Sequence, residues 1–249
     1  MTMQVPSLVH DLTKLPSPAL VIGHFDSDGY LAAEQTRRNL RAARIKVSEV
    51  LISSETSNYR FWTGRFAKMS FGKFPLVVVV DIAFNFKNPK PSLASLLKVC
   101  RNNPSTQFVV IDHHPLLLPK NGPANLTLRS VERVYDCCLG EPSDEFMAVA
   151  SICDGGIVVS SPRWRKRHLK RAQGLKRAAA DKNIAGPRLQ ALLRQRRWSF
   201  FEALAEEPPE FHRTVRGRRI ATNFPSPLLA ALAMSSGTAL STSVLGLRR

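Results

Sequence analysis

Acidic residues and histidines gather at four places in this chain, and both residue types bind divalent cations. The clusters are His24-Phe25-Asp26-Ser27-Asp28-Gly29, Asp81, Asp112-His113-His114 and Asp154. Carboxylate oxygens and imidazoles suit manganese or magnesium better than a thiolate-type zinc site. Such a set favours a centre with two divalent metal ions that hydrolyses phosphate esters.

Three of the clusters follow apolar runs that are typical of buried parallel strands. The run ALVIG (19–23) precedes His24, LVVVV (76–80) precedes Asp81, and QFVVI (107–111) precedes Asp112. The carboxyl ends of parallel strands meet at one edge of a sheet, and ligands bind there. We therefore expect the three clusters to converge. Asp154 instead follows SDEFMAVASI (143–152), which has the Ser cap and acidic first turn of a helix.

Each of these residues also has a purely structural explanation. A strand-end Asp is often a cap or turn residue. Asp154 could simply be a polar residue at the end of a helix that Gly155 and Gly156 terminate. Acids or histidines at all three strand ends favour the joint, functional interpretation. If residues 24–28 stay extended, His24, Asp26 and Asp28 share one face.

The remaining pattern predicts an α/β fold with a mainly parallel sheet flanked by helices. Further helices are expected at 30–43 and 91–100, and further strands at 47–53 and 126–134. After residue 156 a smaller, basic, mostly helical region is expected, with helices at 163–182 and 190–205 and a short strand within 216–249. The sequence thus predicts a catalytic domain at 1–156 and a C-terminal region at 157–249.

The basic excess belongs to the C-terminal region. The net charge is +17 over 249 residues, and Gly156 onward carries 19 Lys and Arg against 5 Asp and Glu. A polyanionic partner or a solvated helix face would each explain this. Candidate nucleic-acid contacts are Arg163, Trp164, Arg165, Lys166, Arg167, Lys170 and Arg171. Trp164 would either stack on a base or anchor the helix in the core.

The motifs His24-x-Asp26-x-Asp28-Gly29, Asp81, Asp112-His113-His114 and Asp154, in this order, resemble the DHH phosphoesterase superfamily over about residues 17–156. That group includes RecJ-like exonucleases, nanoRNases and manganese pyrophosphatases, and HFDSDG is closer to the nuclease-like branch. The resemblance implies that Asp81 bridges two divalent ions, manganese or magnesium. It implies that His24 and Asp26 complete one metal, and that Asp28, His113 and Asp154 complete the other.

The resemblance also implies a catalytic His114 beside the substrate phosphate and an Asp112 that orients a histidine. The expected activity is a manganese-dependent hydrolase, an exonuclease or phosphodiesterase acting on single-stranded nucleic acid or short oligonucleotides. Alternatives are a phosphoesterase for cyclic dinucleotides, phosphoadenosine phosphate or pyrophosphate, and a replication-associated RecJ-like protein. No GGGH-like signature of a substrate-binding domain is present; the nearest stretch, 235–238, lacks the histidine.

The cysteines argue for a reducing compartment. Cys100, Cys137, Cys138 and Cys153 form no CxxC pair, and the adjacent Cys137 and Cys138 are poorly placed to chelate one zinc ion. No secretory signal or membrane span is evident. We expect reduced thiols and a cytoplasmic location, with a homodimer as the candidate assembly.

Overall fold

The computed structural model describes residues 12–53, 57–85, 87–114, 116–119, 121–154, 166–206, 211–213 and 219–221. The chain divides into two compact units, Met1–Met147 and Ala148–Arg249. The domain boundary at residue 156 that the motifs favour stays a prediction. Within the described ranges, no helix is both long and apolar enough to cross a membrane.

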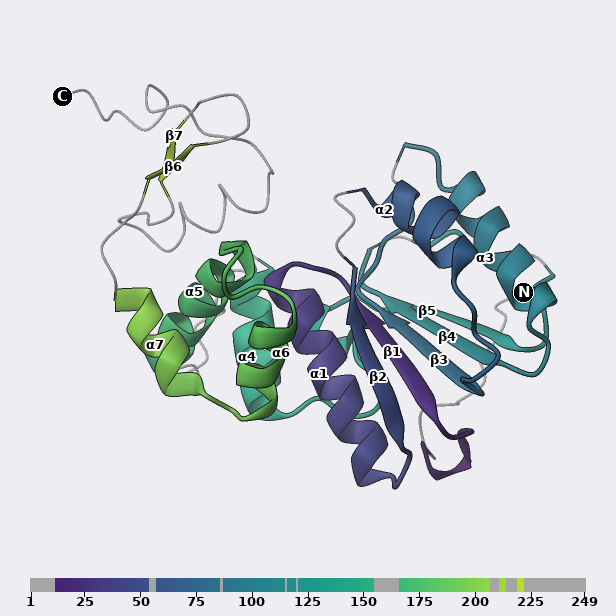
Figure 1. The fold of residues 1–249 in the computed structure, drawn as a ribbon, viewed down its shortest axis with the longest axis horizontal. Helices are drawn as coiled ribbons and strands as arrows, with labels where there is room; N and C mark the ends of the chain where they lie inside the picture. Colours follow the sequence, from purple (N-terminus) through teal and green to yellow (C-terminus); the bar gives the residue numbers. More distant parts are fainter. Residues whose placement is uncertain are drawn as a thin grey trace. The chain divides into compact units, whose positions relative to one another are not determined.

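The first unit is built on a five-stranded sheet with the order β2-β1-β3-β4-β5 (Figure 1). Every pair of neighbouring strands is parallel. The strands are β1 (Ala19–Gly23), β2 (Val47–Ile52), β3 (Leu76–Val80), β4 (Gln107–Asp112) and β5 (Leu126–Ser130). The inner strands β1 and β3 are buried along their whole length, as their continuous apolar sequences require. The predicted α/β fold is confirmed.

Helices cover both faces of this sheet (Figure 1). Helix α1 (Ser27–Ala42) packs against β1 and β2. On the other face, alternate residues of β1, β3 and β4 pack into a core with the aromatic π-helix η2 (Phe61–Phe66) and with α3 (Lys90–Asn102). Trp62 anchors η2 because its Nε1 donates to the Ala83 carbonyl at 3.0 Å. Shorter pieces are η1 (Leu12–Lys14), α2 (Asn58–Arg60) and η3 (Val134–Asp136).

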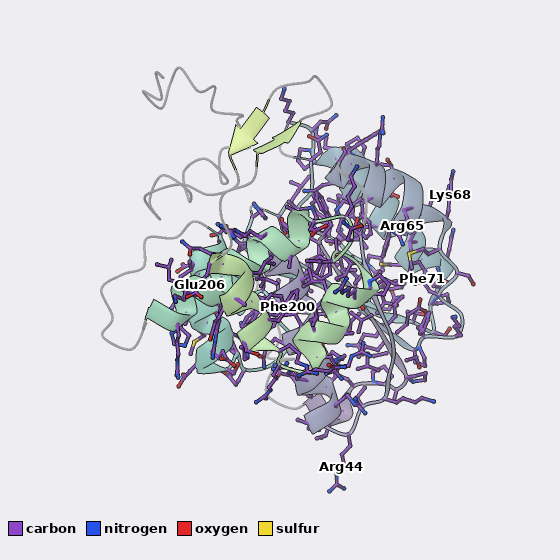
Figure 2. All side chains as sticks on the ribbon, turned by 60° about the vertical axis from the view of Figure 1, so that its left-hand side comes forward. Arg44, Arg65, Lys68, Phe71, Phe200 and Glu206 are labelled. Atoms are coloured by element: carbon purple, nitrogen blue, oxygen red, sulfur yellow. The ribbon has the colours of Figure 1, made fainter. Side chains whose placement is uncertain are left out.

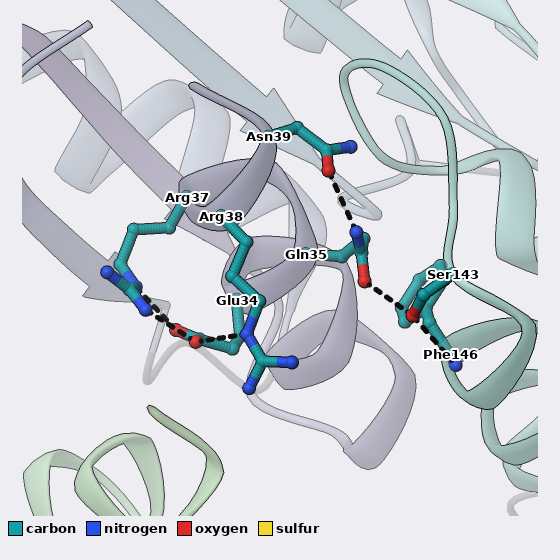
Figure 3. A network of polar contacts seen from close by, with 7 residues as sticks. All are labelled: Glu34, Gln35, Arg37, Arg38, Asn39, Ser143 and Phe146. Atoms are coloured by element: carbon teal, nitrogen blue, oxygen red, sulfur yellow. Dashed lines mark hydrogen bonds and ion pairs between the residues drawn. The ribbon is translucent and has the colours of Figure 1, made fainter. Parts of the chain in front are cut away.

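Polar side chains of α1 bind the segment that follows β5. Gln35 lies between Asn39 and Ser143, accepting from Ser143 Oγ at 3.0 Å and donating to Asn39 Oδ1 at 2.8 Å (Figure 3). Asn39 Nδ2 donates to the Leu139 carbonyl at 2.8 Å, and Thr36 Oγ1 accepts from the Leu139 N–H at 3.0 Å. These buried or half-buried bonds fix the path of residues 137–143 along α1.

The second unit is mainly helical. Helix α4 (Asp144–Cys153) leads into it, and α5 (Lys166–Ala180), α6 (Pro187–Arg194) and α7 (Trp198–Glu206) follow. Helices α5 and α7 approach so closely at Gly174 that a Cβ there would lie 1.8 Å from the Phe201 carbonyl oxygen. The short strands β6 (Phe211–Arg213) and β7 (Arg219–Ala221) pair antiparallel.

The expected single helix at 190–205 is wrong, because α6 ends at Arg194. Arg196 adopts the left-handed conformation with φ 52°. The Arg197 N–H donates to the Leu192 carbonyl and the Arg196 N–H to the Leu193 carbonyl, each at 3.0 Å. These two bonds form a Schellman cap, in which arginine stands where glycine is usual.

Candidate metal centre

The strand order reverses beside β1, and the first and second sequence clusters lie at this point. The chain leaves β1 for α1, whereas it leaves β3 for α3 on the opposite face of the sheet. Ligands of open parallel sheets bind at such switch points, outside the carboxyl ends of the strands. Residues 24–28 follow β1 and Asp81 follows the neighbouring β3, so both clusters occupy this position.

Two glycines hold His24 against the start of α1. A Cβ at Gly29 would lie 2.6 Å from His24 Cβ, and one at Gly23 would lie 2.6 Å from the Gly29 carbonyl oxygen. A side chain at either position would push the loop apart. Residues 24–28 are not extended throughout, because α1 already begins at Ser27. Asp28 therefore lies in the first helical turn rather than on a strand-like face with His24.

Asp26 is both a helix cap and a partner of His24. It is the N-cap of α1, where its Oδ1 accepts from the Gly29 N–H at 3.1 Å. Its Oδ2 lies 2.5 Å from His24 Nδ1. Burial raises the pKa of this carboxyl, but the His24 hydrogen bond and charge and the Gly29 N–H outweigh burial and lower the pKa below its usual value. Asp26 is thus held as a carboxylate at the mouth of the site.

Asp81 is the most constrained residue of the site. Its φ is 58°, a left-handed backbone conformation that residues other than Gly, Asn and Asp rarely adopt. Its N–H donates to the Ile111 carbonyl at 2.9 Å, and it is only 2% exposed. Backbone strain of this kind costs about 1–3 kcal/mol and concentrates at functional sites. A buried carboxylate in a strained turn is more than the structural role of ending β3 requires.

Carboxylates, imidazoles and one thiol converge here in two groups of possible ligand atoms. In one group, atoms of His24, Asp26 and Asp81 all lie within 4.8 Å of one another. In the other, atoms of Asp81, Asp112, His113 and Cys137 do so. Asp28 and His113 also offer atoms within 4.8 Å of each other. Asp81 belongs to both groups, which is the position that a bridging ligand would need.

The histidine pair at the end of β4 divides into an inner and an outer residue. His113 is 11% exposed, and its Nε2 lies 3.3 Å from Asp81 Oδ1. His114 is 36% exposed, and its Nδ1 lies 2.7 Å from Oδ1 of the fully buried Asp112. The same Oδ1 accepts from the His114 N–H at 2.8 Å. Asp112 thus fixes the orientation of the His114 ring through Nδ1.

Cys137 is a member of the site that the sequence reasoning did not identify. It lies about 25 residues beyond the third cluster, just after η3, and is fully buried beside Asp81, Asp112 and His113. Burial, and then the charges of Asp81, Asp112 and Asp28, raise the pKa of this thiol. All four cysteines are free and buried. No spacing rule could have joined Cys137 to the site, because the contact depends on how residues 137–143 bind α1.

Asp154, the fourth sequence cluster, follows α4 in the second unit. It is exposed, and its N–H donates to the Ala150 carbonyl at 2.9 Å. Its position is thus that of a residue that ends a helix. Its role as a metal ligand stays a prediction.

The expected nucleic-acid contacts stay a prediction, and the structure shows the surroundings of some of them. Arg163, Trp164 and Arg165 lie outside the described residues, as does the side chain of Lys166. Arg167 is exposed on α5. Lys170 instead pairs with Glu206, which Figure 2 labels at the end of α7, and Arg171 Nε lies 2.5 Å from Glu202 Oε1. The last two cations therefore join α5 to α7.

Comparisons with known proteins give structural likenesses at low similarity. No protein-family model matches the chain, and no curated protein matches it. Similar solved structures include RecJ in complex with Mn2+ from Thermus thermophilus, at 16% identity and a TM-score of 0.39. A manganese-bound exonuclease RecJ has 15% identity and a TM-score of 0.38. The DHH domain of a member of a family of ribosomal proteins has 13% identity and a TM-score of 0.38.

These matches cover 93%, 92% and 91% of this chain. The chain spans only 36% of the Thermus RecJ and 59% of the second RecJ, and it spans 70% of the DHH domain structure. By the order of its motifs and by the convergence of the first three at one edge of a parallel sheet, the chain resembles the DHH phosphoesterase superfamily.

Proposed function

We propose that this chain is a divalent-metal-dependent phosphoesterase that cleaves phosphodiester bonds in single-stranded nucleic acid or short oligonucleotides. The observation that carries the proposal is the meeting of two ligand groups at Asp81, at the carboxyl ends of β1, β3 and β4. Two carboxylate-rich groups that share one carboxylate are what two closely spaced cations need.

The donor set fits divalent cations. Asp81 and Asp112 are almost completely buried, and burying a carboxylate without a compensating charge costs several kcal/mol. Within the described part of the chain, Asp112 Oδ2 is buried without a hydrogen-bond partner. We propose that His24, Asp26 and Asp81 hold one ion, and that Asp81, Asp28, His113 and Asp154 hold the other. Ions so held supply Lewis acidity toward a phosphate oxygen.

His114 is the residue that we assign to the leaving group. Its Nδ1 is held by Asp112 Oδ1, and we assign the donation of a proton to a leaving oxygen to its Nε2. Asp112 stabilises the protonated ring and keeps it in one orientation. The 36% exposure of His114 places it where a substrate from solvent can reach it, whereas the ligand residues Asp81 and His113 are more deeply buried.

The basic excess supports a polymeric substrate. Among the residues of the second unit whose burial the structure describes, six basic side chains are exposed: Arg167, Lys182, Arg188, Arg194, Arg196 and Arg197. Cations on a surface bind phosphates by displacing counterions, without regard to base sequence. An oligonucleotide therefore explains both the cleavage site and the net charge of +17.

One observation favours a small phosphate compound instead. The pairs Lys170–Glu206 and Arg171–Glu202 occupy two of the cations that a polymer would otherwise contact. A cyclic dinucleotide, phosphoadenosine phosphate or pyrophosphate would need few cations outside the site. Salt separates the two candidates, because affinity for a polymer falls steeply with salt concentration and affinity for a small ligand falls much less.

The test is release of mononucleotides from an end-labelled oligomer with Mn2+ present. We compare the wild-type chain with Asp81→Asn, since Asn also tolerates the left-handed backbone and thus removes only the charge. We expect activity to fall by about 10²-fold or more, with an unchanged circular dichroism spectrum. Glu49→Gln, which removes a half-buried acid on β2 away from the site, is the control and should stay active. Wild-type protein that cleaves no DNA or RNA oligomer would contradict the proposal.

A further inference from the structure

We propose that Cys137 is a metal ligand, and that Asp81, Asp112, His113 and Cys137 together bind a thiophilic divalent cation such as zinc or cadmium. This inference rests on the proposed metal centre and concerns the ion that Asp81 and His113 would hold. A thiophilic cation there would take Asp112 and Cys137 as its other ligands, in place of the Asp28 and Asp154 that we assign to a cation preferring oxygen. The four residues supply two carboxylates, one imidazole and one thiol, all within 4.8 Å of one another.

The number and types of donors suit zinc. Zinc sites are usually tetrahedral, with Zn–S near 2.3 Å and Zn–N and Zn–O near 2.0–2.2 Å, so that donor atoms lie about 3.3–3.8 Å apart. A group already within 4.8 Å needs only small side-chain movements to reach this geometry. Thiolates select zinc and other soft metals, whereas manganese and magnesium prefer oxygen.

Asp112 gives an independent sign that a cation belongs here. Its side chain is 0% exposed, and both hydrogen bonds from His114 fall on Oδ1. Its Oδ2 is buried with no hydrogen-bond partner among the described residues. A buried acceptor without a donor is costly, and a coordinated cation would satisfy it. Asp112 could thus hold His114 with one oxygen and a metal with the other.

The neighbouring cysteine shows that Cys137 is placed differently. Cys138 is equally buried, but its Sγ lies 3.7 Å from the Tyr135 carbonyl oxygen and 3.5 Å from that of Gly140. Its thiol therefore contacts the backbone of its own turn, whereas the Cys137 thiol lies beside the backbone N–H of His113 and the side chains of Asp81, Asp112 and His113. The bonds from Leu139 to Thr36 and Asn39 hold this turn against α1. Cys138 is thus a matched control.

The experiment is a titration of metal-free protein with Cd2+, followed by the ultraviolet charge-transfer band of the cadmium–thiolate bond. We expect the band in wild type and in Cys138→Ser, and its loss in Cys137→Ser. Equilibrium dialysis in parallel gives the amount of bound metal. A wild-type protein that binds Cd2+ without the band, or a Cys137→Ser variant that keeps it, would overturn the inference.

A second measurement needs no variant, in case Cys137→Ser does not fold. X-ray absorption of the zinc-loaded wild type should show a sulfur neighbour at about 2.3 Å. A shell of nitrogen and oxygen alone would contradict a Cys137 ligand. Oligonucleotide cleavage with Mn2+ is measured on the same preparation. Cleavage without a thiolate signal rejects this inference alone, whereas a thiolate signal without cleavage rejects the proposed function alone.

Discussion

The charged residues at the carboxyl ends of strands β1, β3 and β4 and those of helix α5 have partners of different kinds. At these strand ends, Asp26, Asp81 and Asp112 contact imidazoles, and Asp81 and Asp112 also lie beside a thiol. On α5, Lys170 and Arg171 contact glutamates of α7. The imidazoles and the thiol can join the carboxylates in coordinating a divalent cation, whereas these two glutamates pair with basic side chains.

This difference separates charge that binds a ligand from charge that stabilises a fold. A carboxylate and a neutral imidazole are both electron-pair donors, so a divalent cation can bind the two side chains together. A lysine beside a glutamate is already compensated, and the pair is a modest contribution when it is partly exposed. The type of partner, rather than the number of charges, therefore identifies the candidate site in this molecule.

The largest expected effect concerns the outer histidine. His114→Gln removes the group that we assign to protonation of the leaving oxygen, so kcat should fall by about 10²–10⁴-fold with little change in KM. Steady-state kinetics on an oligonucleotide with Mn2+ measures both constants. Arg44→Gln, at an exposed position just after α1, is the control. An unchanged kcat would place His114 outside the reaction.

The second effect tests the fold of the helical unit. In Gly174→Ala, the new Cβ would lie 1.8 Å from the Phe201 carbonyl oxygen, so α5 and α7 must separate. We expect a loss of about 3 kcal/mol in the free energy of unfolding. Chemical denaturation measures it. Gly72→Ala, whose Cβ meets nothing within 4 Å, should cost far less. Equal losses would show that close packing at Gly174 is not the cause.

A smaller effect tests which cations meet a polymer. Arg167 is exposed and Lys170 is paired with Glu206. If the second unit binds oligonucleotides, Arg167→Gln should reduce the slope of log affinity against log salt by about 1. Lys170→Gln should leave the slope almost unchanged. Binding of a labelled oligomer at several salt concentrations measures both slopes. A larger change of slope in Lys170→Gln than in Arg167→Gln would show that Lys170, and not Arg167, contacts the oligomer.

The smallest effect concerns Cys100, a buried thiol away from the sheet edge. Burial raises its pKa from an ordinary value of 9.0 to about 12. The folded state therefore keeps a proton that the unfolded state loses above about pH 9, so this contribution to stability is lost as pH rises from 9 to about 12. Denaturation from pH 8 to 11 should show a shallower decline in Cys100→Ala than in wild type. Parallel curves would contradict this.

Much of the first unit could be predicted from its sequence. The runs at 19–23, 76–80 and 107–111 are apolar throughout because these strands are covered on both faces. Their ends therefore gave the positions of His24, Asp81 and Asp112. The segment Phe61–Phe66 was not identified, because its aromatic residues and Gly64 follow neither a strand period nor an α-helical one.

Two further features depend on information that local sequence lacks. The end of α6 needs a left-handed residue, and Arg196 carries no signal of one because glycine is the usual residue there. The place of Cys137 depends on hydrogen bonds between Leu139 and two residues of α1 about 100 positions earlier. Contacts over such distances along the chain are set by tertiary packing and not by local pattern.

The left-handed backbone at Asp81 also limits how this site can evolve. With φ at 58°, the position accommodates Gly, Asn and Asp without further strain, and most other residues would distort the turn after β3. An aspartate codon is one base change from a glycine codon and one from an asparagine codon, so both replacements are within easy reach. Only Asp among the three carries a charge. Exchange of Asp81 for Asn or Gly would therefore keep the backbone of the turn and remove the carboxylate, so this chain could lose the candidate site without losing its fold.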